Sequence, residues 1–146
     1  MKKLLCFCVL FLVSIHIPNA YSAERIVEML NKREDGQKMV YSQDIVNIDI
    51  NDTVKWMPTS KGHNVHFVSV PGSLEIPKKS KVNKEYSYTF NQPGIYLYQC
   101  TPHRSMGMIG LVIVGEDTSN INEIASSKVV GMSKKKLAKL IESIDY

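Results

Sequence analysis

The chain has 146 residues, of which 44% are hydrophobic, and a formal net charge of +4. This length predicts a single domain with a modest core. The basic excess is too small to favour nucleic-acid binding, and no basic stripe with interleaved aromatic residues supports it. The sequence also contains no internal repeat, glycine-rich phosphate loop or low-complexity tract, so functions that depend on those features are not indicated.

The first 22 residues have the pattern of a secretory signal peptide. Lys2 and Lys3 precede an apolar run at residues 4–13, and small residues occupy suitable positions before a cut after Ser22. A membrane anchor is the alternative, but the run is too short to span a bilayer comfortably. We therefore expect export to the periplasm and a mature domain of residues 23–146. Removing two of the 18 basic residues against 14 acidic ones leaves a net charge of +2.

The first half of the mature chain has short apolar runs that alternate with polar residues, a period-two pattern typical of half-buried strands, and further short runs follow, each bounded by Pro, Gly or Asn. The clearest run places Val46, Ile48 and Ile50 on one face, and the turn residues Asn51 and Asp52 end it. A charged turn at residues 32–36 follows the first run. The predicted strands are residues 26–30, 46–50, 54–56, 65–70, 85–90, 95–99 and 109–114. Such spacing favours a β-sandwich.

The C-terminal part changes to helical periodicity. Residues 121–125 predict a short helix, and a second helix follows, with Ser133 as its N-cap. Lys134, Lys135 and Lys136 lie in its first turn, where they oppose the helix dipole and are best interpreted as solvated side chains. Its apolar stripe at i, i+3, i+4 and i+7 consists of Leu137, Leu140, Ile141 and Ile144.

Cys100 would be the only cysteine after signal removal, because Cys6 and Cys8 lie in the expected signal peptide. It can then form no intramolecular disulfide, and it is either a buried structural thiol or a metal ligand. The segment 100–108 combines Cys100 with His103 and two methionines. A thiolate and an imidazole suit copper in both oxidation states, and a second imidazole with an axial thioether would complete the set.

His63 is the candidate for the second imidazole. A Cys and a His separated by two residues often occur by chance, but here they follow a β-rich pattern. His66 would point to the opposite face of its strand from His63, so we expect a surface histidine there. A thiol hydrolase built on Cys100 and His103 is the enzymatic alternative. No third residue is evident to orient the histidine, and Pro102 has no N–H to stabilise an oxyanion.

Residues 61–65 together with residues 100–108 resemble the copper-binding signature of the cupredoxin family, in particular its pseudoazurin group. The resemblance runs from about residue 23 to the C-terminus. It implies an all-β, Greek-key cupredoxin β-sandwich with two C-terminal α-helices. It also implies one type 1 copper per chain, cycling between Cu(I) and Cu(II), with His63, Cys100, His103 and Met108 as ligands. Met108 matches the group's loop length, whereas Met106 is too close to His103 to reach the metal and should lie on the surface.

The resemblance also assigns roles to neighbouring residues. The backbone N–H of Asn64 would donate to the Cys100 sulfur, and its side chain would tie the two ligand segments together. Tyr96, four residues before Cys100, would brace a neighbouring loop. Period two puts Tyr96, Tyr98 and Cys100 on one strand face, which the resemblance places inward, although the opposite face is also apolar and periodicity alone leaves the core face open. Pro102 would deny the thiolate a second N–H donor.

These features imply a periplasmic, monomeric one-electron carrier and not an enzyme, since a four-ligand copper has no open position for a substrate. The resemblance suggests a respiratory redox partner such as nitrite reductase. The alternative is a copper storage or chaperone protein. Docking would be transient, at a surface formed by His103 and Met106. A basic rim would surround that surface, with Lys38, Lys61, Lys79, Lys81 and Arg104 as its members.

Overall fold

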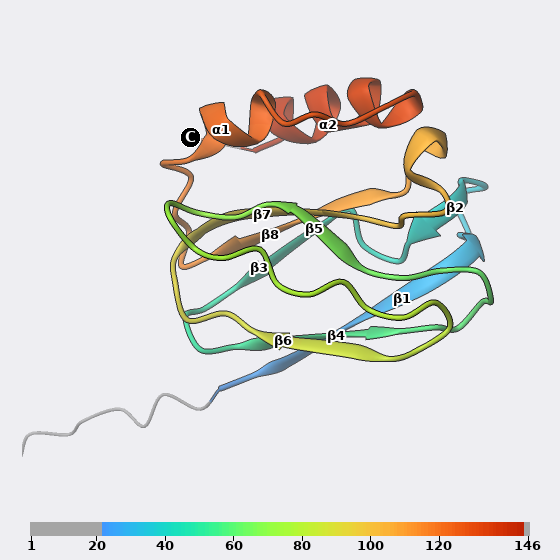
Figure 1. The fold of residues 1–146 in the computed structure, drawn as a ribbon, viewed down its shortest axis with the longest axis horizontal. Helices are drawn as coiled ribbons and strands as arrows, with labels where there is room; N and C mark the ends of the chain where they lie inside the picture. The colour runs from blue at the N-terminus through green and yellow to red at the C-terminus, as the bar shows by residue number, and fades with distance from the viewer. Residues whose placement is uncertain (1–21, 145–146) are drawn as a thin grey trace, which may run out of the picture.

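The computed structural model describes residues 22–144 and contains two four-stranded sheets packed face to face (Figure 1). The first sheet has the order β2-β1-β4-β6, and the second has the order β3-β8-β7-β5. Strands β1 and β4 are parallel, as are β3 and β8, and the other neighbours are antiparallel. The strands are β1 Glu24–Lys32, β2 Lys38–Tyr41, β3 Ile45–Ile48, β4 Thr53–Met57, β5 His66–Ser69, β6 Tyr86–Thr89, β7 Gly94–Gln99 and β8 Ile109–Val114.

All seven predicted strands are present, and the predicted sandwich with two C-terminal helices is confirmed. Strand β2 was not predicted, and it forms a hairpin with β1 across the expected turn. The prediction for Ile50 is wrong: β3 ends at Ile48, and the Ile50 side chain is 45% exposed. Asp52 organises this turn, because its carboxylate accepts a hydrogen bond from the Asp49 N–H. The expected signal peptide lies outside the described residues, apart from Ser22.

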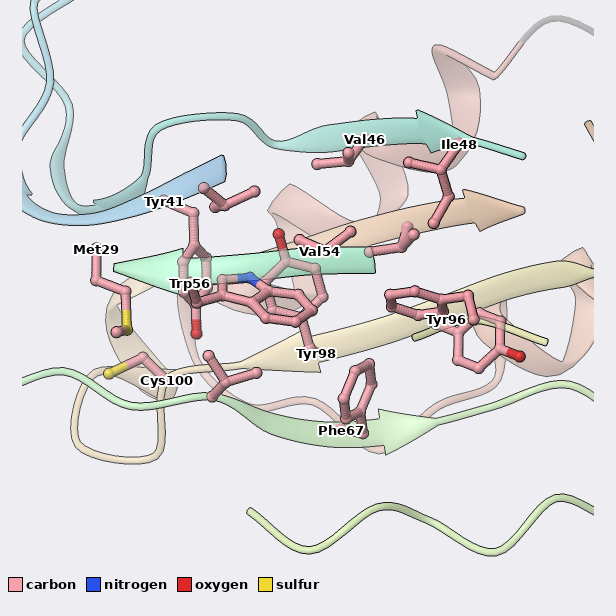
Figure 2. Close-up of a cluster of buried hydrophobic side chains, with 14 of the residues drawn as sticks. Met29, Tyr41, Val46, Ile48, Val54, Trp56, Phe67, Tyr96, Tyr98 and Cys100 are labelled. Atoms are coloured by element: carbon pink, nitrogen blue, oxygen red, sulfur yellow. The ribbon is translucent and has the colours of Figure 1, made fainter. Parts of the chain in front are cut away.

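Both faces of β7 are buried, which explains why periodicity could not choose between them. Tyr96 and Tyr98 point between the sheets, into an aromatic core that also contains Trp56. Figure 2 shows Cys100 at one end of this core. Residues Ile95 and Leu97 point the other way, into a second apolar layer. The strand therefore contributes side chains to two cores, and Cys100, the residue directly after its end, lies at the edge of the aromatic core.

The second apolar layer lies under two helices, α1 Ile121–Ala125 and α2 Met132–Glu142. They cover the outer face of the second sheet (Figure 1). The predicted stripe is confirmed in that Leu137, Leu140 and Ile144 are buried against the sheet. Ser133 is not the N-cap as predicted: Gly131 occupies that position, and Ser133 is a buried residue of the first turn. Within the described part of the chain, no helix is both long and apolar enough to cross a membrane.

Candidate metal centre

The structure brings together three of the side chains that the sequence indicated as ligands. The Cys100 Sγ lies 3.7 Å from Nδ1 of His63 and 3.5 Å from Nδ1 of His103. The ligand atoms of these three residues all lie within 4.8 Å of one another. His63 and Cys100 are fully buried, and His103 is half-buried. Three donors therefore converge on one small space at the end of the aromatic core.

These donors come from separate parts of the fold. His63 lies in the connection between β4 and β5, whereas Cys100 directly follows β7. Residues 100–108, which we call the ligand loop, then return the chain to β8. The N–H of Cys100 donates to the carbonyl of Met108 at 2.9 Å, which closes the base of the loop. Gly107 adopts a φ of 92°, a left-handed conformation that favours glycine, and so allows the chain to turn back.

Asn64 joins the two ligand-bearing segments, as the resemblance implied. Its side-chain Oδ1 accepts a hydrogen bond of 2.8 Å from the N–H of Thr101. Its Nδ2 donates to the Thr101 hydroxyl and to the Ser80 carbonyl, both at 3.3 Å. The Asn64 carbonyl accepts a bond of 2.8 Å from the buried Tyr41 hydroxyl. The positions of His63 and Cys100 are thereby coupled through a buried network.

Asn31, in β1, orients His63 and was not found by sequence reasoning. Its Oδ1 lies 2.9 Å from Nε2 of His63. An amide oxygen can only accept, so Nε2 carries the proton and Nδ1 presents a lone pair towards Cys100. This is how a metal-binding histidine is commonly fixed. The two residues are 32 positions apart, and no local pattern marks the pairing.

The pKa shifts at the site follow from its burial. Burial lowers the pKa of His63, and the neighbouring His103 adds to this effect, so the neutral, ligating form is favoured. Burial raises the pKa of the Cys100 thiol, and the backbone N–H groups of Asn64 and His103 oppose that rise. Pro102 has no N–H, as expected, but it does not leave Asn64 as the only donor, because His103 supplies another.

The two methionines of the ligand loop have opposite environments. Met108 is fully buried in the aromatic core beside Cys100, whereas the Met106 side chain is 46% exposed. The expected surface position of Met106 is confirmed. His66 is not among the grouped donors, in agreement with the expectation that it is not a ligand. It is half-buried and not fully exposed as expected, and its Nδ1 has no hydrogen-bond partner among the described residues. Burial, followed by the charges of Lys79 and Arg104, lowers the pKa of His66.

The donor set fits copper. A thiolate and two imidazoles are soft or borderline ligands, and the cluster contains no carboxylate of the kind that magnesium or calcium prefers. Zinc also accepts Cys and His ligands, but a buried thioether at the base of the same loop is typical of a copper electron-transfer site.

Comparison with known proteins agrees with this chemistry. Residues 27–115 match the family model described as copper-binding proteins of the plastocyanin/azurin family. The chain is 40% identical over 117 residues to a putative pseudoazurin of Rhizobium leguminosarum bv. viciae, covering 80% of this chain and 76% of the relative. It is 36% identical over 119 residues to the pseudoazurin of Paracoccus pantotrophus, covering 80% of this chain and 81% of that relative. The crystal structure of native pseudoazurin from Hyphomicrobium denitrificans matches with a TM-score of 0.78 at 37% identity, covering 84% of this chain and 99% of that one.

Proposed function

Because the chain belongs to the plastocyanin/azurin family of copper-binding proteins and is a pseudoazurin-like blue copper electron carrier, we propose the following copper ligands, redox partner and cellular location. The ligands are His63, Cys100, His103 and Met108. Residues 1–22 are a signal peptide, and residues 23–146 act as a monomer in the periplasm. The redox partner is an acidic respiratory protein such as nitrite reductase.

The convergence of three donors from two separate segments, the β4–β5 connection and the ligand loop, carries the ligand assignment. When bound, copper supplies the Cu(I)/Cu(II) couple. The protein's part is to hold the donors still: Asn31 fixes the ring of His63, and Asn64 ties its segment to the ligand loop. Ligands held by the fold move little when the metal changes charge, so little reorganisation opposes electron transfer. The full burial of His63 and Cys100 disfavours a storage or chaperone protein, whose ligands must exchange readily.

His103 is the route by which electrons leave, because it is the half-buried member of an otherwise buried set. Pro102 and Met106 are exposed beside it in the ligand loop and form an apolar collar. A partner that covers this collar can approach the His103 ring without intervening water. The proposed docking surface is therefore His103 with Pro102 and Met106.

Exposed basic residues lie next to this docking surface. Lys61 and Arg104 each lie within two positions of a ligand histidine, and Lys79 lies close enough to His66 to act on its pKa together with Arg104. Lys81 lies two residues before Asn83, whose N–H donates a hydrogen bond to the carbonyl of His63. Lys38 lines a groove that Met106 also lines. This basic rim favours an acidic partner.

The visible spectrum of the copper-loaded protein tests the proposal. The oxidised wild type should bind one copper and be strongly coloured through the thiolate–copper charge transfer, and a reductant should bleach it reversibly. Cys100→Ser should lose the colour and keep a folded sandwich by circular dichroism. Colour retained in Cys100→Ser would refute the ligand set. A colourless wild type that passes copper rapidly to a chelator would favour the storage or chaperone alternative.

A further inference from the structure

The exposed middle of the ligand loop has little support of its own. The 3₁₀ turn Arg104–Met106 contains no buried residue. Its internal bonds are those of a short turn, such as the Met106 N–H to the His103 carbonyl at 2.9 Å. Yet this turn separates His103 from Met108, so its shape sets where both side chains lie. Some other part of the protein must hold it.

The first turn of α2 contacts this segment directly. Ser133 is fully buried, and its hydroxyl donates to the carbonyl of Arg104, 29 positions away. Gly131 lies so close to the loop that an added Cβ would be 2.9 Å from the Ser105 Cα. An added Cβ on Gly107 would lie 3.7 Å from the Cβ of Met132. Three successive residues of the helix start thus touch the ligand loop on its outer side.

The helix itself is anchored independently of the loop. Leu137 and Leu140 are buried against the second sheet. Lys136 forms an ion pair of 2.7 Å with Asp44, just before β3, and Asp44 is in turn 3.2 Å from Arg33. A contact from this helix can therefore transmit the rigidity of the sheet to the ligand loop.

We propose that the first turn of α2 is a brace that holds the ligand loop in its metal-binding shape before copper enters, with Ser133 as the positioning residue. The proposal rests on the ligand set given above. The Ser133 hydroxyl serves the loop and not the helix, since it does not cap α2. Removing the hydroxyl would leave the Arg104 carbonyl without this donor, a loss that costs more than an ordinary surface change.

Amide hydrogen exchange in the metal-free protein tests the brace. In Ser133→Ala, the amide of Met106 should exchange about fivefold faster than in the wild type, the change expected for one net hydrogen bond. The exchange rates of amides in the second sheet, such as that of Ile113, should increase less. Ser143→Ala is the matched control, because the Ser143 hydroxyl also bonds to a backbone carbonyl, that of Leu140 at 2.7 Å, at the far end of the same helix. Ser143→Ala should leave the exchange rate of the Met106 amide unchanged.

A second readout is the rate at which a Cu(I) chelator removes the metal, which should rise about fivefold in Ser133→Ala and not in Ser143→Ala. Equal acceleration of exchange at Met106 and Ile113, or equal effects of the two variants, would overturn the brace.

If Ser133→Ala does not fold, Lys136→Met should show the same acceleration of exchange confined to the loop, because it loosens the helix anchor. Absence of that acceleration in Lys136→Met would also overturn the brace. The exchange data do not depend on copper, so failure of the ligand set would be recognised separately, as a protein that exchanges as expected but binds no copper.

Discussion

Met106 and Met108 are two positions apart in the ligand loop but differ completely in environment. Met108 is fully buried with Cys100 in the aromatic core, whereas Met106 is 46% exposed. The same loop therefore contains one thioether suited to the interior and one suited to a docking surface. Substitutions at the two positions should separate the tuning of the metal from the contact with the partner.

Met108→Gln should keep copper and lower the reduction potential, because an oxygen donor is harder than a thioether and favours Cu(II). The fall should be about 59 mV for each tenfold gain in relative affinity for Cu(II). Met106→Gln is the control and should leave the potential unchanged. Cyclic voltammetry measures both. A shift with Met106→Gln alone would mean that the axial assignment is wrong.

Copper binding should release a proton from Cys100. Burial raises the pKa of this thiol, so it is protonated in the metal-free protein at neutral pH, whereas the ligand must be a thiolate. At about pH 8 we expect close to one proton released per copper, and apparent affinity should rise about tenfold per pH unit below the thiol pKa. An indicator dye in weak buffer measures the release. No release at this pH would show that the thiol is already ionised.

The start of α1 also fastens β7, the strand that carries Cys100. Asn120 is the N-cap of α1 by position, but its side chain makes no capping bond. Instead its Oδ1 accepts from the Ile95 N–H and its Nδ2 donates to the Ile95 carbonyl, both at 2.8 Å. One buried side chain thus satisfies both backbone polar groups of a residue in β7.

Asn120→Ala should lower the free energy of unfolding by about 2 to 4 kcal/mol, because it leaves two buried backbone groups unpaired. Urea denaturation measures the loss. Asn122→Ala, at an exposed position of α1, should stay within about 0.5 kcal/mol of the wild type. The charge-transfer band of Asn120→Ala should be unchanged, since the contact does not involve a ligand. A loss comparable to that of Asn122→Ala would contradict this role.

Across the whole molecule, charge and apolar contact should act differently on electron transfer. Charge reversal at Lys61 or Arg104 should slow reduction of an acidic redox partner mainly at low salt, since rim charges affect the encounter rate. The effect should shrink as the Debye length falls to about 8 Å at physiological ionic strength. Lys128→Glu, at an exposed position outside the basic rim, makes the same charge change and should have a smaller effect.

Met106→Glu should instead slow transfer at every salt concentration without altering the copper spectrum, because a charge in the collar prevents close approach. Stopped-flow kinetics over a salt series distinguishes the two behaviours. Rim variants that are equally slow at all salt concentrations, or an unaffected Met106→Glu, would move the docking surface elsewhere. The start of α2, with the exposed Lys134 and Lys135, would be the next candidate.

The parts of the fold that depend on neighbouring residues were predictable. Period two marked strands with one buried face, such as β3 and β4, and the 3.6-residue stripe marked α2, because each pattern reports burial of one face by one element. Strands β7 and β8, which are buried on both faces, were recognised as short apolar runs bounded by turn residues. Strand β2 was missed because its adjacent residues Val40 and Tyr41 are both buried, which breaks the alternation. The expected burial of Ile50 was wrong because alternation continues in the sequence after Ile48, where the strand has already ended.

The sequence alone determined the chemistry of the site, since Cys100, His103 and both methionines lie on one short loop. It also proposed His63 as the second imidazole, which the family resemblance then supported. The tertiary structure decided what surrounds them. Asn31 faces His63 across 32 positions, and Ser133 bonds to the ligand loop across 29. Ser133 looked like an ordinary cap because local sequence reports only local hydrogen bonds. Contacts between remote segments depend on how the sheets and helices pack, and no pattern within either segment records them.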